Sequence, residues 1–98
     1  MTVTKILDEN KLTLFVDGKL DTKDSPKLLD EFNESSAGVD EVVIDLAKVN
    51  YMSSSGLRVH LTAQKAMSKR GKLSIVNVSP DMMEVFELTG FTKILNIQ

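Results

Sequence analysis

The sequence contains no cysteine and no tryptophan, and it has a single histidine among 98 residues. The absence of cysteine excludes disulfide bonds, thiolate metal ligands and a cysteine nucleophile, and it is consistent with a reducing compartment. No stretch approaches the roughly 18 apolar residues of a membrane-spanning helix, and the N-terminus lacks the apolar segment of a signal peptide. We therefore expect a cytoplasmic protein that does not insert into a membrane.

An excess of charge of one sign is also lacking. The 12 Lys and Arg residues and the 14 Asp and Glu residues leave a formal net charge of −2. Proteins that bind nucleic acids usually concentrate positive charge, because contacts with phosphates dominate their affinity. The composition therefore gives no support for direct binding to nucleic acid. A chain of this length can bury one hydrophobic core, and we expect a single domain over residues 1–98.

Apolar residues recur with two different periods along the chain. Alternation at every second residue is typical of strands, and apolar residues three or four apart are typical of helices. Strands that alternate with helices favour a mixed sheet with parallel crossover connections. We predict an α/β fold, on the border of the α+β class, with the element order ββαβαβαβ. The strands are expected at residues 3–7, 12–16, 42–46, 73–76 and 94–97, and the helices between residues 26 and 33, 53 and 70, and 80 and 90.

Capping residues mark the predicted helix ends. Ser25–Pro26 and Ser79–Pro80 each combine an N-cap residue with a proline at the first helical position. Gly71 and Gly90 are expected to follow the ends of the second and third helices. The third helix is expected to bury its apolar residues, which are Met82, Met83, Val85, Phe86 and Leu88.

The second predicted helix has two different faces. One face is a narrow polar stripe, formed by Arg58, Thr62, Lys65 and Lys69. The opposite face is apolar and is formed by Val59, Ala63, Ala66 and Met67. A solvated helix surface is a sufficient explanation for the two lysines of the stripe.

Catalytic arrangements are hard to build from these residues. A serine hydrolase needs a base beside its nucleophile, and the only histidine, His60, stands five residues after Ser55. Five residues turn a helix by about 500°, so these two side chains diverge. We interpret His60 as a partly buried structural residue, and a phosphocarrier role for it is the remaining enzymatic alternative. The sequence predicts no catalytic residues and no enzyme.

Metal and cofactor sites lack their usual patterns. With no cysteine and one histidine, only carboxylates remain as metal ligands, and their spacing does not resemble an oxygen-ligand loop. Gly71–Lys72 does not complete a phosphate-binding loop, and it precedes a predicted strand rather than a helix. We therefore predict no metal ion and no cofactor.

One feature does suggest a function: three serines and a glycine, Ser53 to Gly56, stand at the start of the second helix, directly after a buried strand. Two interpretations are open. A serine there can cap the helix by accepting hydrogen bonds from its free N–H groups, and one serine is enough. Alternatively, a serine there is a phosphorylation switch. The helix dipole would tolerate the phosphate, which would add about −1.5 to −2 charges to a binding surface and repel a partner.

Three motifs, in order and at the right spacing, resemble those of the STAS domain family, which includes the bacterial anti-sigma factor antagonists. Gly18–Asp21 is similar to the family's G-x-L-D motif, and Tyr51–Leu57 is similar to its hydrophobic-M-D-S-S-G-L signature. The segment from Ser79 to Phe91 resembles the family's S-P…L…G-F/L ending. The resemblance covers nearly the whole chain and implies a single STAS-like domain, a small mixed sheet with helices mainly on one side.

The resemblance also implies a non-catalytic regulator. In the anti-sigma factor antagonists, the unphosphorylated protein binds an anti-sigma factor that is also a serine kinase, and the sigma factor is released. The kinase phosphorylates the second serine of D-S-S-G, which weakens the complex, and a PP2C-type phosphatase resets it. Carried onto this sequence, the phosphorylated residue is Ser55, with Ser54 as the alternative, and Asp21 matches an aspartate that helps to engage the kinase.

The partner is therefore expected to bind a surface, here called the predicted partner surface, made of Asp21, Ser53, Ser54, Ser55, Gly56, Leu57 and Arg58. An exposed Tyr51 or Met52 would strengthen this expectation. Ser53 departs from the family, which usually has aspartate there, and this change could alter recognition by the kinase. The alternative is a STAS subunit that binds a stress-signalling or transporter partner constitutively, with Ser55 only as a helix cap.

Overall fold

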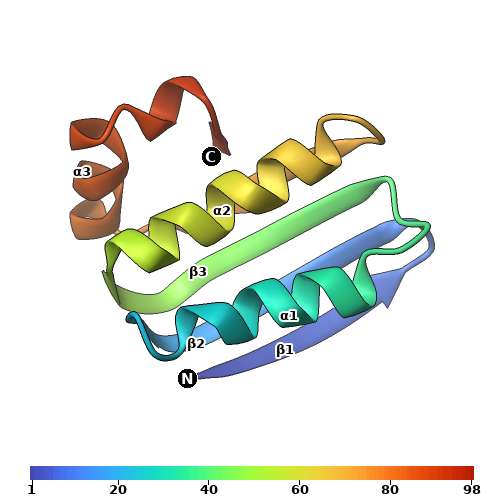
Figure 1. The fold of residues 1–98 in the computed structure, drawn as a ribbon, viewed down its shortest axis with the longest axis horizontal. Coiled ribbons are helices and arrows are strands. Elements are labelled where there is room, and N and C mark those ends of the chain that lie inside the picture. The colour runs from blue at the N-terminus through green and yellow to red at the C-terminus, as the bar shows by residue number, and fades with distance from the viewer.

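The structure, a computed structural model, describes all 98 residues and contains one five-stranded sheet (Figure 1). The strands lie in the order β1-β2-β3-β4-β5. The first two form an antiparallel hairpin, and the other neighbouring pairs are parallel, which confirms the predicted mixed sheet and element order. The strands are β1 (Thr2–Asp8), β2 (Lys11–Leu20), β3 (Glu41–Met52), β4 (Lys72–Val76) and β5 (Asn96–Ile97).

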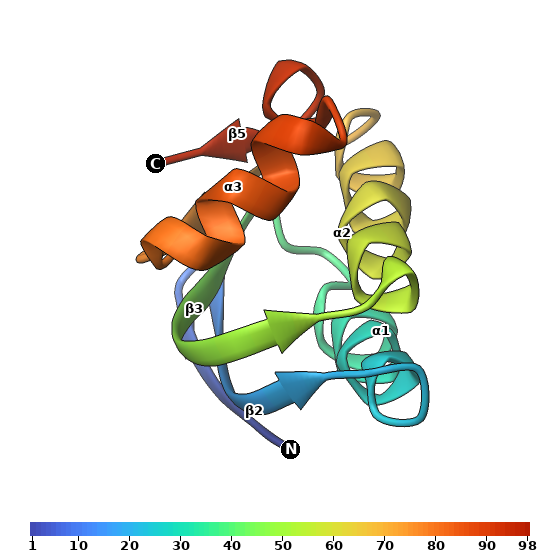
Figure 2. The same ribbon diagram turned by 90° about the vertical axis from the view of Figure 1, so that its left-hand side faces the viewer.

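The helices lie mainly on one side of the sheet, as predicted. Each helix joins two parallel strands that are neighbours in the sheet, and such crossovers are nearly always right-handed. Because the strand order advances in one direction, right-handed crossovers bring the connecting helices to the same side. Figures 1 and 2 show α1 and α2 across one face, and α3 at the end where β3 continues beyond β4. The helices are α1 (Ser25–Ser35), α2 (Ser54–Met67) and α3 (Pro80–Leu88).

The core lies between the sheet and these helices and contains 21 buried hydrophobic residues. Alternation along β2 places Leu12, Leu14 and Val16 on the helix-covered face, as predicted. From the helices, Leu28 and Phe32 are among the residues that fill the space above the strands. None of the helices is both long and apolar enough to cross a membrane.

The third strand is longer than predicted. β3 has 12 residues, and residues 47–52, which were predicted to lie outside the strand of residues 42–46, continue it. Two register shifts between β2 and β3 disturb the alternation of side chains, so that Leu46, Val49 and Met52 are buried at every third residue. A spacing of three does not resemble a strand in sequence, which explains the error.

Two predicted helix ends are also corrected. The N-cap of α1 is Asp24, and Ser25 is the first helical residue. α2 ends at Met67, so Gly71 is not the residue that follows its C-cap. Gly71 is instead required by close packing, because a Cβ atom there would overlap the backbone carbonyl of Asp40. Helix ends often differ by one or two residues from a sequence-based assignment.

The C-terminal region agrees with the prediction at its start and differs after it. Ser79 caps α3 by accepting a hydrogen bond from the N–H of Met82 at 3.2 Å, and Gly90, with φ of +78°, follows the end of the helix as predicted. Leu88, however, is 79% exposed rather than buried. The last strand is only two residues long, because residues 91–93 form a short 3₁₀ helix and leave Ile94 half exposed.

Candidate functional site

The two segments that carry the predicted partner surface meet at one end of the molecule. β2 and β3 are parallel neighbours, so their carboxyl ends share an edge of the sheet (Figure 2). Leu20, the last residue of β2, is paired with Met52, the last residue of β3. The backbone N–H of Ser53 donates a hydrogen bond to the carbonyl oxygen of Leu20 at 2.8 Å. The turn that contains Asp21 therefore lies beside the start of α2.

Ser53 is the N-cap of α2. Its hydroxyl oxygen accepts a hydrogen bond from the N–H of Gly56 at 3.3 Å, and the hydroxyl donates to the carbonyl oxygen of Leu20 at 3.0 Å. Aspartate is as good an N-cap residue as serine and could accept the Gly56 bond, but a carboxylate could not donate to Leu20. The capping role that the sequence left open among the three serines therefore belongs to Ser53.

Replacing this cap is expected to destabilise the fold modestly. Ser53→Ala removes both hydroxyl hydrogen bonds and should lower the free energy of unfolding by about 1 kcal/mol, measured by urea denaturation. Ser54→Ala is the matched control, because Ser54 is exposed, and should change the free energy of unfolding by less than about 0.5 kcal/mol. Equal losses in the two variants would contradict the assignment of the cap to Ser53.

The hydroxyls of Ser54 and Ser55 form no hydrogen bond with the protein, in contrast to that of Ser53. Ser54 is exposed and Ser55 is half-buried. Ser55 lies on the wall of a groove of about 190 Å³ between α1 and α2. The groove is lined by Ser25, Pro26 and Leu29 from α1 and by Ser55, Arg58, Val59 and Thr62 from α2.

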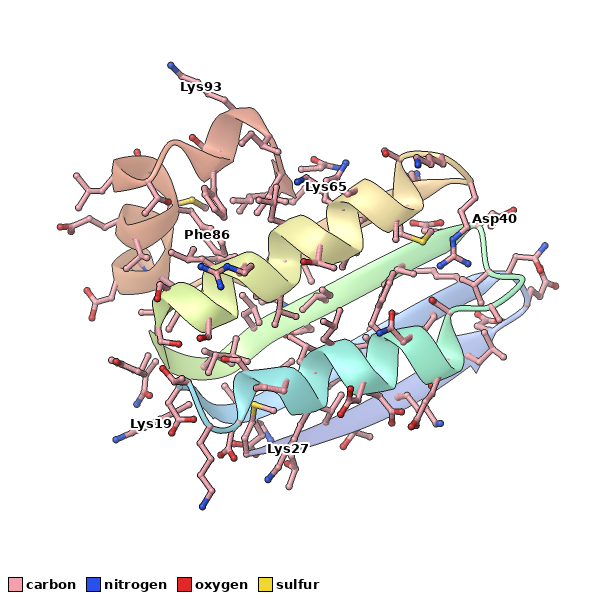
Figure 3. The ribbon with its side chains drawn as sticks, viewed as in Figure 1. Lys19, Lys27, Asp40, Lys65, Phe86 and Lys93 are labelled. Carbon is pink, nitrogen blue, oxygen red and sulfur yellow. The ribbon has the colours of Figure 1, made fainter.

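All four residues of the polar stripe are exposed, as predicted, although the last of them, Lys69, lies in the turn after α2. Arg58 begins the stripe, one turn after Ser55, and makes neither a hydrogen bond nor an ion pair. Lys65 follows two turns later on the outer side of the helix (Figure 3). Of these residues, only Arg58 and Thr62 line the groove that contains Ser55.

Gly56 and Leu57 are buried, although both belong to the predicted partner surface. A Cβ atom on Gly56 would lie 2.7 Å from Cγ of Met52 and 3.0 Å from Leu20, so only glycine allows α2 to start this close to the strands. Leu57 is 8% exposed and belongs to the hydrophobic core. These two residues therefore fix the first turn of α2 against the core. The expectation that the Leu57 side chain contacts a partner is not supported by its burial.

Asp21 organises the turn between β2 and α1, a role that the sequence analysis missed. Its carboxylate accepts a hydrogen bond from the N–H of Asp24 at 2.7 Å, and its carbonyl oxygen accepts two from Ser25, at 2.9 Å and 2.6 Å. The signal was present, because aspartate often bonds to the backbone just after it in turns. A hydrogen-bonded ion pair with Lys27 at 3.2 Å lowers the pKa of Asp24, and the α-amino group of Met1 acts in the same direction.

Of the two apolar residues at the end of β3, Tyr51 is 48% exposed and Met52 is buried. Tyr51 therefore meets the condition that one of them should be exposed near the predicted partner surface. It contributes an aromatic surface two residues before the helix cap, and aromatic side chains of this kind are enriched in protein interfaces.

His60 is completely buried, rather than partly buried as predicted. Its Nδ1 lies 2.8 Å from the carbonyl oxygen of Gly56, so Nδ1 carries the proton and donates it. Its ring packs edge-on against Phe86 of α3, with centroids 5.7 Å apart, and its Nε2 has no partner. Burial lowers the pKa of His60 to about 4, against the opposing effect of the Gly56 hydrogen bond. A buried neutral imidazole is not accessible to a phosphoryl donor, which removes the phosphocarrier alternative.

One sheet with helices on one side, and a serine-rich helix start where β2 and β3 end, define a STAS-like domain. A model of the STAS domain family matches residues 2–98, and the chain belongs to this family. An anti-sigma-B factor antagonist of Listeria monocytogenes is 32% identical over 94 residues, which are 93% of this chain and 82% of that protein.

Two solved structures show the same fold at low sequence identity. An anti-sigma factor antagonist from Mycobacterium paratuberculosis is similar with a TM-score of 0.89 and 23% identity, over 98% of this chain and 83% of that one. The phosphorylated form of SpoIIAA, a cell fate determinant of Bacillus, is similar with a TM-score of 0.75 and 17% identity, over 99% and 91% of the two chains.

Proposed function

We propose that the protein is an anti-sigma factor antagonist whose unphosphorylated form binds an anti-sigma factor and whose phosphorylation at Ser55 ends that binding. The observation that carries this proposal is the division of roles among the serines. Ser53 provides the helix cap, so the hydroxyl of Ser55 is unused, half-buried and free to react. The family membership and the name of the Listeria relative support the antagonist function.

The anti-sigma factor is proposed to be the serine kinase itself, and a PP2C-type phosphatase is proposed to reverse the modification, both in the cytoplasm. In the forward step the oxygen of Ser55 attacks the γ-phosphorus of ATP. A new P–O bond forms, the bond to ADP breaks, and the hydroxyl proton is released. The protein contributes the substrate serine and no catalytic group. The phosphorylated SpoIIAA structure supports this step, because it shows that a protein of this fold accepts a phosphate.

The switch is proposed to act through charge at the predicted partner surface. Phosphorylation would change the formal net charge from −2 to about −4, with the whole change at one helix start. The fold itself would tolerate the phosphate, because the N-terminus of a helix favours negative charge. A partner that approaches this surface would instead meet a strongly hydrated dianion, and placing like charges opposite each other costs several kcal/mol at an interface.

The test is to incubate the protein with its cognate anti-sigma factor and ATP and to map the phosphorylated residue by mass spectrometry. Ser55→Ala is expected to abolish phosphorylation, and Ser55→Asp is expected to weaken binding of the anti-sigma factor by about tenfold or more, or about 1.4 kcal/mol. Ser54→Ala is the matched control and should be phosphorylated normally. Phosphorylation that persists in Ser55→Ala would refute Ser55 as the acceptor and would favour Ser54.

The constitutive alternative, a STAS subunit of a stress-signalling or transporter complex, has less support. It requires Ser55 to act only as a helix cap, whereas Ser53 makes the capping hydrogen bond. Under this alternative, serine in place of aspartate at position 53 would accompany the loss of phosphorylation. Serine at this position keeps the capping bond, so the change has a structural explanation that leaves Ser55 available.

A further inference from the structure

Arg58 is the only arginine in the protein without a partner. The sequence contains two arginines, and Arg70 donates hydrogen bonds to the carbonyl and hydroxyl oxygens of Ser36 at 2.8 Å and 3.0 Å. Arg58 makes no such bond and no ion pair. Its guanidinium group therefore makes no polar contact that would stabilise the fold.

The position of Arg58 relative to Ser55 suggests a function for its guanidinium group. Ser55, Arg58 and Thr62 are three and four residues apart on α2, so they share one face of the helix and line the same groove. Long side chains on a helix lean toward its N-terminus, over the preceding turn. The guanidinium group of Arg58 can therefore reach back to a group attached to the oxygen of Ser55.

We propose that Arg58 binds the phosphate of phosphorylated Ser55, within the groove between α1 and α2. This inference rests on the proposed phosphorylation of Ser55 and adds the place where the phosphate is held. A guanidinium group presents two parallel N–H donors that match two phosphate oxygens, and such charge-assisted bonds are among the strongest in proteins. The groove offers room beside Ser55, with a volume of about 190 Å³.

The other charged groups near the groove do not compete with Arg58 for the phosphate. The α1 residues that line it are Ser25, Pro26 and Leu29, none of which is charged. Lys27 is paired with Asp24 and lies on the side of α1 away from α2 (Figure 3). The turn between β2 and α1 carries the exposed Lys23 and the carboxylates of Asp21 and Asp24, of which the first bonds to backbone and the second to Lys27. The exposed Lys19, next to the last residue of β2, also lies at this end of the molecule but does not line the groove (Figure 3).

This arrangement gives Arg58 two alternative uses. In the unphosphorylated protein its guanidinium group is exposed beside Ser55 and is available to an acidic group of the partner. In the phosphorylated protein the phosphate withdraws it from that surface. Phosphorylation would then both add negative charge and remove a positive contact. Aspartate at position 55 carries one charge on a shorter side chain, so Ser55→Asp is expected to reproduce only part of the effect.

The test installs phosphoserine at position 55 during translation, so it needs no kinase. The second ionisation of the phosphate is followed by ³¹P NMR in the full-length protein. Removing the cation with Arg58→Gln is expected to raise the pKa of the phosphate by about 0.5 to 1, and Arg58→Lys should restore part of the difference. Lys65→Gln, on the same stripe but further along α2, is the matched control and should leave the pKa unchanged.

The same pKa in the phosphorylated wild-type protein and in Arg58→Gln would overturn the inference. The outcome is distinguishable from failure of the proposed function. If the phosphorylated protein binds the anti-sigma factor as tightly as the unphosphorylated one, the proposed function fails, whatever the NMR titration reports. If binding is lost on phosphorylation and the pKa does not depend on Arg58, only the present inference fails.

Discussion

Lowering the pH from 7.5 to 4.5 is expected to reduce the free energy of unfolding by about 2 to 3 kcal/mol more in the wild-type protein than in His60→Leu. The difference arises from a single group. His60 is completely buried, and this burial lowers its pKa to about 4, whereas a histidine in the unfolded chain titrates near 6.5. Few single ionisations are expected to influence the stability of a domain this small so strongly.

The sign of the effect follows from which state binds the proton. Above pH 6.5 both states are neutral at His60, so the residue adds no dependence on pH. As the pH falls from 6.5 toward 4, the unfolded chain binds a proton that the folded protein does not, and stability decreases. Below about 4 the folded protein binds the proton too, and the contribution levels off. The ion pair of Asp24 with Lys27 is lost at still lower pH, because the pKa of Asp24 is below its ordinary 3.8.

The experiment compares urea denaturation of the two proteins at several pH values. His60→Leu has no titrating group at this position, and groups common to both proteins cancel in the comparison. Leucine loses the hydrogen bond to Gly56 but also removes the unpaired Nε2 from the core, so the variant should fold at pH 7.5. A direct NMR titration of His60 provides the control. A pKa near 6.5 in the folded protein, or parallel pH profiles for the two proteins, would contradict the expectation.

The architecture could be predicted from the sequence because its signals are local. Alternating apolar residues such as Leu12, Leu14 and Val16 indicate one face of a strand, and Ser79–Pro80 indicates a helix start. The second half of β3 could not be predicted in this way. Its buried residues depend on register shifts against β2, which are set by the pairing of two segments far apart in the chain.

The candidate site was predictable in its location but not in the roles of its residues. Each of Ser53, Ser54 and Ser55 has the side chain needed to cap a helix, and only the exact start of α2 selects Ser53. The burial of Leu57 depends on the rotation of α2 against the sheet, and the free guanidinium of Arg58 depends on which acidic groups lie nearby. These are tertiary properties, so no local pattern could reveal them.

Replacing Gly56 by alanine is expected to weaken both the fold and the binding of the partner. The added Cβ would lie 2.7 Å from Cγ of Met52, which is buried, and 3.0 Å from the carbonyl oxygen of Leu20. That carbonyl is fixed by two hydrogen bonds from Ser53, so the strand end cannot easily yield. Overpacking of this kind costs about 1–3 kcal/mol, and the better helix propensity of alanine returns up to about 1 kcal/mol. A net loss of about 1–2 kcal/mol in the free energy of unfolding is expected.

The loss of binding should exceed what the loss of stability explains. To relieve the contact, the first turn of α2 must move away from Leu20, and this separates Ser55 and Arg58 from the turn that contains Asp21. Gly38→Ala is a control of similar cost, because Gly38 has φ of +76° and no atoms near a Cβ, so alanine there strains the backbone by about 1–2 kcal/mol far from the site. Both variants should be less stable in urea, but only Gly56→Ala should bind the anti-sigma factor more weakly in calorimetric titrations of folded protein. Equal affinities would mean that the partner does not depend on how closely α2 approaches the end of β2.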